Sequence, residues 1–485
     1  MCLFKMSNMM TIKKNQYMKF KTLILGMLLL GFSSCNKWLD VDLINQVDEN
    51  KLFAKEQGFN DALAGVYSQL SEQSLYGRKL SFEMLDVFAQ YYNYNSISED
   101  YKKMRDYDYK DQVVRNQVDG VWSGLYANIS SLNNIIRWEQ KKGDVMRPDV
   151  RKQVLGETLA LRAYLHFDLL RMFCEDVKFN HNAKGIAYNK QFGVSLPPMY
   201  TAAECYQLVL TDLKDAYANL DLVDPINLVV PYTLVDKNQT DKHVARMNKY
   251  AVKALMARVY LTLGDKVNAL KCAKEVIESN KFRLLDYKTS IDVDDTEKDI
   301  LFSDEHIFSL RNKSIPDWSQ ALHFDVKSDK GTTGAKLTLG DIGAMYGYNN
   351  DDARYQFWTD INKMTKYTRG NAKVYYPKIP MIKLSEMYLI AAESLYDTDL
   401  DGCLTYLNAL RKSRIRNAAD WFYITRDILF EEIIREYPGE GQLFYAYKRL
   451  NKGIKNNSGI GDIPAAKAIF VFPIPDKEIE MGNRN

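Results

Sequence analysis

The sequence predicts a mainly α-helical fold of stacked helix pairs, with a loop-rich second region that carries short strands. Three observations predict it. Apolar residues recur at helical spacing in several long segments, which indicates amphipathic helices. Two of these segments also share small residues at matching positions, as repeats do. Between those two lies a long stretch rich in Gly, Asn, Asp, Ser and Thr, residues that favour turns and loops.

Four helices are predicted before the first repeated segment. In Gly58–Leu70 the residues Phe59, Leu63 and Val66 fall on one helical stripe. The stretches 118–138, 151–173 and 201–220 show the same periodicity. We expect the two long helices within about 117–174 to form one pair.

The repeated segments are about 245–280 and about 382–415. In the first, small residues include Ala257, Ala269 and Ala273, and Gly264-Asp265 makes the turn. In the second, Ala391 and Cys403 fall at equivalent positions. This spacing is typical of tetratricopeptide-like (TPR-like) units, whose small residues let two helices approach closely. Such units bury their faces against neighbours, so a stack is implied.

The stretch of about 283–380 is the loop-rich insertion. A loop of that length without structure of its own is uncommon inside a compact domain unless it is functional. We therefore expect short strands and surface loops that lie on the helices. Near the C-terminus, the run 469–472 before Pro473 predicts a brief apolar strand.

The N-terminus looks like a bacterial lipoprotein signal. Lysines precede an apolar run, Leu23–Phe32, which is followed by Ser33, Ser34 and Cys35. We expect residues 1–34 to be a signal peptide, whose true start could be Met18. Cys35 would carry the lipid and 35–50 would form a tether before a domain over 51–485. The alternative is a buried or membrane-spanning helix, but the run is shorter than the roughly 20 residues that span a bilayer.

Composition excludes several classes of function. Removal of residues 1–34 would leave 60 basic and 62 acidic residues, and no basic stripe indicates nucleic acid binding. The five His and the scattered Cys lie outside metal-site spacings, and phosphate-loop, dinucleotide and serine-hydrolase motifs are missing. We therefore predict no metal and no cofactor. The cysteines are expected to act as small buried hydrophobic residues, and His166 as a structural residue.

Seven segments together resemble the SusD/RagB family of outer-membrane nutrient-binding lipoproteins. They are CNKWLD from Cys35, ALAGVY from Ala62, the Trp122, Leu125, Tyr126, Ile129 and Asn133 pattern, GETLALRAYLHF from Gly156, KALMARVYL from Lys253, LSEMYLIAAE from Leu384, and FPIPDKEI from Phe472. Their order and spacing cover essentially the whole chain after Cys35. Cys174, where the family often has Gly, and Glu440-Gly441-Gln442, where it has Glu-Gly-x-Arg, depart from the pattern.

The resemblance implies a lipid-anchored, surface-exposed outer-membrane protein that captures a nutrient and catalyses no reaction. It would partner a TonB-dependent SusC-like transporter, act as its lid, and pass a glycan, or in some relatives a peptide, into the barrel. The resemblance also implies that loops supply the ligand-binding residues.

The first candidate binding residues lie in the run from Phe88 to Asn95, with Tyr91, Tyr92, Asn93 and Tyr94. Aromatic rings can lie against the C–H face of a sugar, while Asn and Gln bind hydroxyls. The run lacks a helical period, which indicates a loop. The alternative is a loop whose tyrosines pack back onto the helices.

Two further candidate groups lie inside the insertion. Trp318 is the second candidate. The third group is Tyr346, Tyr348, Arg354 and Trp358; here Arg354 would either bind a carboxylate or, as we expect, pair with Asp351 or Asp352. The acidic pairs Glu431-Glu432 and Asp351-Asp352 are expected to be solvated or to form ion pairs.

Three functions follow for testing. The leading hypothesis is a glycan-binding lipoprotein, with a peptide-binding relative as its variant. The second is a helical-repeat scaffold that binds proteins and no nutrient. The third is a surface glycoside hydrolase, which would need two carboxylates about 5–9 Å apart.

Overall fold

The computed structural model describes residues 49–93, 97–193, 196–228, 243–328, 331–368, 377–455 and 461–482. The chain divides into two units, Met1–Leu52 and Phe53–Asn485. In the first unit the described part is helix α2 (Glu49–Leu52). The remaining described elements belong to the second unit.

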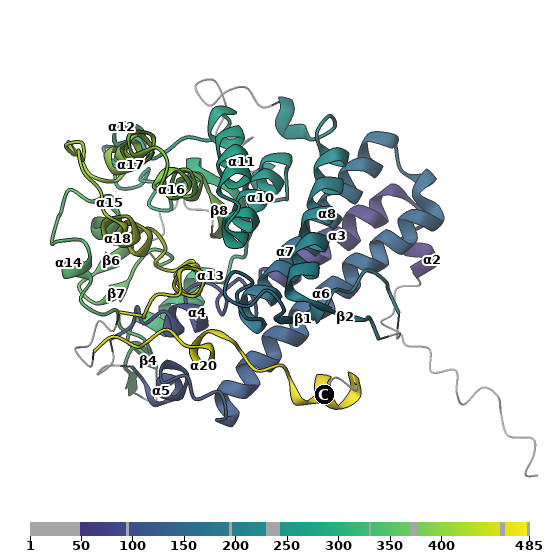
Figure 1. Ribbon diagram of the computed structural model, residues 1–485, viewed down its shortest axis with the longest axis horizontal. Helices are drawn as coiled ribbons and strands as arrows, with labels where there is room; N and C mark the ends of the chain where they lie inside the picture. The colour runs from purple at the N-terminus through teal and green to yellow at the C-terminus, as the bar shows by residue number, and fades with distance from the viewer. Residues whose placement is uncertain are drawn as a thin grey trace, which may run out of the picture. The chain divides into compact units, whose positions relative to one another are not determined.

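Eight helices of the second unit lie side by side in one continuous series (Figure 1). Each contacts the next in the order α3, α6, α7, α8, α10, α11, α16 and α17. Their bounds are α3 (Glu56–Leu70), α6 (Gln112–Lys142), α7 (Pro148–Phe173), α8 (Ala202–Leu220), α10 (Lys249–Leu263), α11 (Lys266–Glu278), α16 (Leu384–Leu395) and α17 (Leu400–Arg414). This series is the predicted stack of TPR-like helix pairs.

Local sequence explains where these helices begin and end and how closely they approach one another. The Asn248 side chain accepts hydrogen bonds from two backbone N–H groups at the start of α10. Gly264, at φ 82°, ends α10 in the left-handed conformation that glycine adopts without strain. Gly156 lets α7 approach α8, because a Cβ there would lie 2.6 Å from Leu220. The small residues Ala257 and Ala273 are fully buried between helices, as the repeat spacing predicts.

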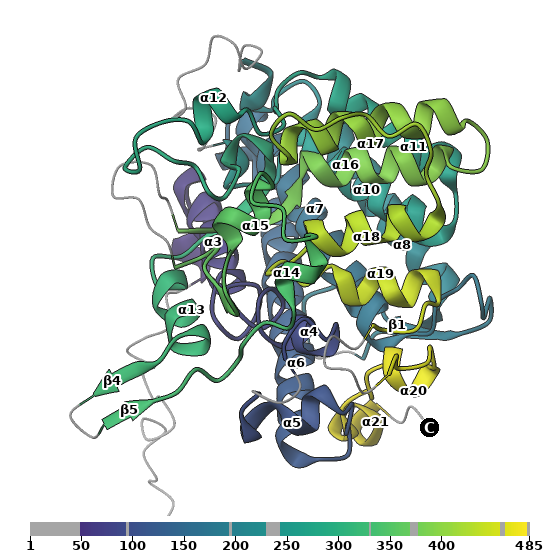
Figure 2. The same cartoon turned by 90° about the vertical axis from the view of Figure 1, so that its left-hand side faces the viewer.

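The rest of the unit holds short helices, two-stranded sheets and loops (Figure 2). The helices are α4 (Met84–Phe88), α5 (Glu99–Arg105), η2 (Gly143–Val145), η3 (Pro225–Leu228), α12 (Tyr287–Ser290), η5 (Ser303–Glu305), α13 (Ile315–His323), α14 (Ile342–Met345), α15 (Ala353–Trp358), α18 (Arg426–Glu436), α19 (Leu443–Leu450), α20 (Lys467–Phe470) and α21 (Asp476–Gly482). The fold class predicted from sequence is therefore confirmed.

The strands pair locally, with one exception. Antiparallel pairs join β1 (Lys184–Ala187) to β2 (Met199–Thr201), β4 (Val326–Ser328) to β5 (Gly331–Thr333), and β6 (Thr359–Asp360) to β7 (Lys363–Met364). The exception is β3 (His306–Arg311), which pairs with β8 (Lys378–Lys383) across the insertion, with Ser309 opposite Pro380. Because β8 leads directly into α16, this sheet ties the insertion to the helical stack.

The predicted C-terminal strand at 469–472 is wrong. Residues Lys467–Phe470 form α20, and the N–H of Phe472 donates to the carbonyl of Met172 at 2.9 Å. Met172 lies in the last turn of α7, where carbonyls have no partner within the helix. The apolar run therefore completes a helix end instead of joining a sheet.

Two arginines of the family-like segments form ion pairs inside the protein. Arg258 of α10 donates to both carboxylate oxygens of Glu386 in α16, at 2.6 Å each. Arg162 of α7 does the same to Asp212 of α8, at 2.7 and 2.8 Å. All four side chains are buried. These motifs therefore specify contacts between helices.

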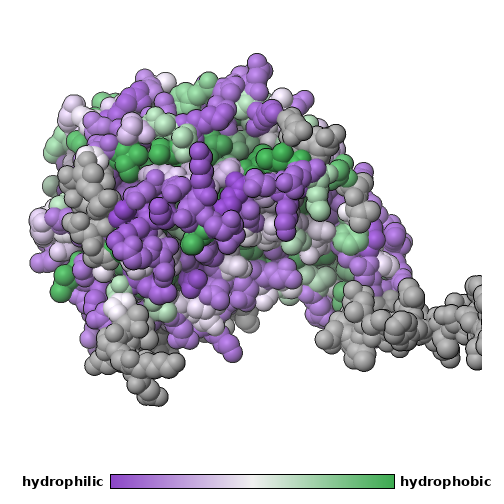
Figure 3. Space-filling model, turned by 90° about the horizontal axis from the view of Figure 1, so that it is seen from below, coloured by the Kyte–Doolittle hydropathy of each residue, from purple (hydrophilic) through white to green (hydrophobic). Residues whose placement is uncertain are grey.

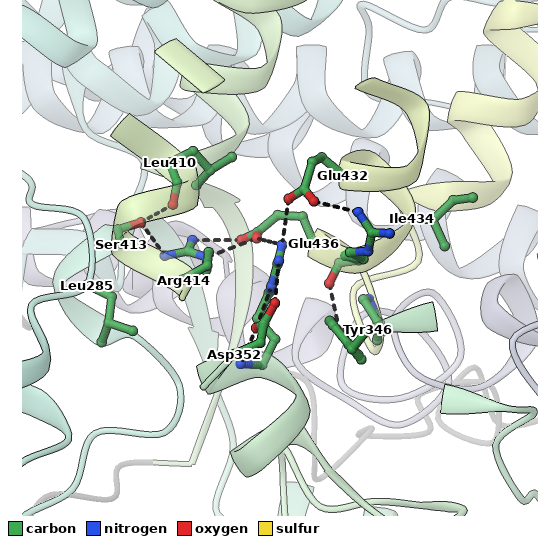
Figure 4. A network of polar contacts seen from close by, with 12 residues as sticks. Leu285, Tyr346, Asp352, Leu410, Ser413, Arg414, Glu432, Ile434 and Glu436 are labelled. Carbon is green, nitrogen blue, oxygen red and sulfur yellow. Dashed lines mark hydrogen bonds and ion pairs between the residues drawn. The ribbon is translucent and has the colours of Figure 1, made fainter. Parts of the chain in front are cut away.

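A larger buried ion network lies where α15, α17 and α18 meet (Figure 4). Glu436 accepts from Arg354 at 3.2 Å, from Arg414 at 2.8 Å and from Lys383 at 2.9 Å. Burial alone would raise the pKa of Glu436, but these cations hold it well below its ordinary value. Arg414 also binds both oxygens of Glu305, at 2.6 and 2.7 Å.

His166 and four cysteines have the structural roles predicted for them. His166 is fully buried, stacks on Tyr188 and accepts from the N–H of Asn189 at 3.0 Å. Burial lowers the pKa of His166 to about 3, so the ring is neutral at pH 7. The buried free cysteines are Cys174, Cys205, Cys272 and Cys403.

Candidate functional site

The first candidate tyrosines are buried. Tyr91 is 1% exposed and its hydroxyl donates to the carbonyl of Ile434 at 2.6 Å. Tyr92 is 2% exposed, donates to the carbonyl of Phe82 at 2.5 Å and stacks on His323. This arrangement agrees with the packing alternative. Ligand contact by either ring stays a prediction.

Of the remaining residues in the first and second candidate groups, two are half-buried and one lies outside the described residues. Asn93 is half-buried, and its backbone N–H donates to Thr338 O at 2.7 Å. Trp318 is half-buried on α13, against Gly77. Tyr94 and the lipidation residue Cys35 lie outside the described residues. The binding roles of Asn93, Tyr94 and Trp318 stay predictions.

In the third candidate group, three residues are structural. Arg354 is fully buried and pairs with Asp352 at 2.7 Å, which confirms the expected ion pair. Trp358 is buried and its indole N–H donates to Ile300 O at 2.8 Å. Tyr346 is buried and donates to Arg435 O at 2.8 Å.

Tyr348 differs, because 65% of the residue is exposed. It lies just after α14 at φ 53°, with Gly347 also at positive φ, and its N–H donates to Gly343 O at 2.7 Å. The ring lies so close to Gly343 that a Cβ there would meet it at 2.2 Å. Its hydroxyl donates to Asp341 at 3.2 Å. Tyr348 is thus an aromatic ring held in one orientation at the surface.

A pocket of about 390 Å³ is lined by Asp341, the residue that accepts from the Tyr348 hydroxyl. Tyr348 itself is outside the lining of this pocket. Its wall comes from the α14 region, from α18 and α19, and from the chain after α4, which lie close together in Figure 2. It is lined by Ala89, Tyr91, Asp341, Ala344, Met345, Glu431, Ile434, Arg435, Leu443, Tyr447 and Lys455. A pocket of this volume falls in the range of small-molecule sites, about 300–1,000 Å³. We call it the Tyr348 pocket.

The rim of the Tyr348 pocket carries two acids and two bases. Glu431 lies 3.2 Å from Arg435 and 3.8 Å from Lys455, so their charges largely compensate. Arg435 is further fixed by donation to Met345 O at 2.7 Å, which also holds α14 on α18. The pair Glu431-Glu432 takes part in ion pairs, as expected, since Glu432 lies 2.6 Å from Arg435.

Two other cavities are less suited to a sugar. One, of about 60 Å³, lies among α7, α16 and α19 beside the Arg258–Glu386 pair, with room for a few water molecules. Another, of about 490 Å³, lies at the α6–α7 turn and is lined by Glu139, Asp144, Met146, Pro148, Arg151, Lys152, Leu155 and Asn219. Within the described chain its lining holds no aromatic ring. On the face shown in Figure 3, hydrophilic residues predominate and hydrophobic residues form small separate patches.

In the part of the chain that the structure describes, no group of three or more His, Cys, Asp or Glu side chains is arranged to hold a metal ion. Across the same residues, no helix combines the length and the apolar character needed to cross a bilayer.

Sequence reasoning missed the α18 and α19 side of the pocket. In the sequence Glu431 is recognisable only as half of an acidic pair, while Arg435, Leu443 and Tyr447 carry no motif that indicates binding. Tyr91 and Ile434, which meet in the pocket wall, lie 343 residues apart. Aromatic residues in the loop-rich insertion were the usable signal, and they included Tyr348.

Comparisons with known proteins agree with the fold. Residues 37–261 match a SusD-like family described as "Starch-binding associating with outer membrane". SusD-like protein P38 of Formosa agariphila is 22% identical over 315 residues, covering 64% of this chain and 55% of P38. SusD-like protein P2 of the same organism is 22% identical over 516 residues, covering 93% and 95%. The chain thus spans about half of one relative and nearly all of the other.

Solved structures share the architecture. A SusD superfamily protein from Bacteroides thetaiotaomicron superposes with a TM-score of 0.68 at 21% identity, covering 88% of this chain and 98% of that one. A laminarin-binding SusD-like protein gives 0.61 at 17% identity, covering 88% and 97%. At these identities the superpositions establish the fold. The family match over residues 37–261, the two relatives and this shared fold together support membership of the SusD/RagB family.

Proposed function

We propose that this protein captures a glycan and delivers it to a TonB-dependent SusC-like transporter. Two observations support glycan as the ligand. The matching family is described as starch-binding, and a protein of the same fold is described as laminarin-binding. Delivery to the transporter rests on the resemblance to the family alone, and so does the absence of a catalysed reaction.

The proposed location is the cell surface, on the outer membrane. The sequence pattern that ends at Cys35 supports a lipid anchor there. The description of the family as associating with the outer membrane supports the same location.

The Tyr348 pocket is the proposed ligand site, and the held, exposed ring of Tyr348 is the observation that carries it. A flat aromatic ring offers an apolar face to the C–H groups of a sugar. Gly343 and Asp341 already fix the ring, so little side-chain entropy remains to be lost on binding. The rim residues Asp341 and Lys455 supply an acceptor and a donor for hydroxyl groups. Trp318 and Asn93 are retained as proposed contacts of a longer ligand.

Binding to immobilised polysaccharides, including laminarin and starch, tests the proposal. The soluble form from Asn36 onward is used, and both affinity and ligand breakdown are measured. Y348A is expected to weaken binding by about tenfold, the loss of a stacked ring being worth about 1–1.5 kcal/mol. Y423A is the matched control, because Tyr423 is similarly exposed, at 67%, on the loop between α17 and α18.

The outcomes separate the hypotheses. Saturable binding without breakdown, lost in Y348A and kept in Y423A, supports capture at this pocket. The proposed site is refuted if both variants lose glycan binding equally, or if neither loses it. Binding of peptides alone identifies the peptide-binding variant, release of shorter glycans identifies a hydrolase, and binding of neither ligand favours the scaffold.

A further inference from the structure

The Tyr348 pocket has an apolar floor beneath its charged rim. Ala89, Tyr91, Leu443 and Tyr447 line it and are each nearly inaccessible to solvent. Asp341 and Lys455, by contrast, are exposed. The charged side chains therefore lie at the mouth of the pocket, and buried, mostly apolar side chains form its floor.

Both tyrosine hydroxyls of the floor already take part in a hydrogen bond within the protein. The Tyr91 hydroxyl donates to Ile434 O at 2.6 Å. The Tyr447 hydroxyl accepts from the N–H of Lys455 at 3.4 Å. A sugar hydroxyl that entered this floor would give up its hydrogen bonds to water and gain few in return, which is unfavourable. A methyl or acyl group has no such bonds to lose and gains by leaving water.

The rim does not select a charged ligand. Arg435 and Lys455 both lie near Glu431, and Asp341 faces the Tyr348 hydroxyl. A sulfate or uronate would meet carboxylates as well as cations at the mouth. The charges are therefore suited to binding hydroxyl groups of a neutral sugar.

From these three observations we infer that the Tyr348 pocket binds a neutral glycan through an apolar substituent, such as an O-acetyl or O-methyl group. The substituent enters the floor, the rim binds neighbouring hydroxyls, and Tyr348 holds the adjoining sugar ring. This inference rests on the proposed glycan-binding function and names the class of glycan within it.

Matched polysaccharides test the inference. Acetylated glucomannan, acetylated xylan and partially O-acetylated laminarin are each compared with the same polymer after mild alkaline deacetylation. Each buried methyl group is expected to tighten binding about fourfold, so the acetylated form of the bound polymer should bind at least that much better.

Two pocket-filling variants and a control locate the effect. A344W and the milder A344L place a larger side chain at the pocket wall, at an exposed position where folding should be tolerated. Both should remove the preference for the acetylated form while circular dichroism stays unchanged. A64W alters an exposed alanine of α3 and should leave the preference intact.

Equal binding of acetylated and deacetylated polymers, or a preference that survives both Ala344 variants, overturns the inference while leaving the proposed function standing. Failure to bind any glycan overturns both. Binding of apolar peptides in place of glycans, blocked by A344W, would assign the same floor to a different ligand and also overturn the inference.

Discussion

Replacement of Arg414 by Met should be among the most damaging single changes in this fold. Arg414 is fully buried and binds Glu305 through two bonds and Glu436 through two more, between 2.6 and 3.0 Å. Met keeps much of the aliphatic volume but no charge. Glu436 would retain Arg354 and Lys383, whereas Glu305 would lose its ion-pair partner. Removing one member of a buried ion pair costs about 3–5 kcal/mol.

A double-mutant cycle separates the charge from the packing. E305Q removes the carboxylate charge that R414M leaves unpaired. The glutamine keeps an oxygen that can still accept from the Leu285 N–H, which donates to Glu305 at 2.9 Å in the native protein. We expect the double variant R414M/E305Q to recover about 1–3 kcal/mol of the loss. K452M is the control, because its partner Asp427 is 82% exposed and such a pair contributes about 1 kcal/mol or less.

Urea denaturation at pH 7, followed by circular dichroism, measures these free energies of unfolding. If R414M lost less than about 1 kcal/mol, comparable to an exposed pair, the network would not be the stabilising charge cluster described here. A double variant less stable than R414M alone would show that Glu305 is not an unpaired buried charge in R414M.

Three further predictions follow from other buried groups. Because the pKa of Glu436 is well below its ordinary value, its ionisation stabilises the fold fully above about pH 4.5, and this contribution is lost as the pH falls further. The free energy of unfolding should therefore fall less steeply with decreasing pH in E436Q than in the native protein. H166F should cost about 1–3 kcal/mol in urea, since the Asn189 N–H loses its acceptor. It should also reduce the loss of stability below about pH 6.5, because His166 no longer takes up a proton on unfolding, while the buried His306 and His323 still do. G441A should lower the melting temperature sharply, because Gly441 has a φ of 66° and a Cβ there would lie 2.2 Å from a backbone oxygen. G65A should instead raise the melting temperature slightly, because nothing lies within 4 Å of the added Cβ and Ala has the better helix propensity.

Much of the fold could be predicted because it depends on local periodicity. The stripe of Phe59, Leu63 and Val66 does become the buried face of α3, and Gly264 does end α10. A helix needs only residues three and four apart to define its buried face, so neighbouring residues carry the information. The strand expected at 469–472 failed because a strand needs a partner, and no local pattern supplies one.

The aromatic candidates were harder to assign, because exposure is not a local property. Tyr91 and Tyr348 both lie in polar, aromatic segments, yet one is 1% exposed and the other 65%. The difference arises from α18, which covers Tyr91 and supplies the Ile434 carbonyl that satisfies its hydroxyl. A tyrosine can be buried wherever its hydroxyl finds such a partner, so its type alone does not predict a binding role.

The sequence by itself determined the helical repeats and the resemblance to the family, since these depend on spacing along the chain. Only the tertiary structure decided which aromatic ring faces solvent and where a pocket forms. The wall of that pocket joins chain segments near Tyr91, Ala344 and Leu443, which are remote in sequence. Their approach is set by packing and by buried ion pairs such as Arg414–Glu436, whose partners become neighbours only once the chain has folded.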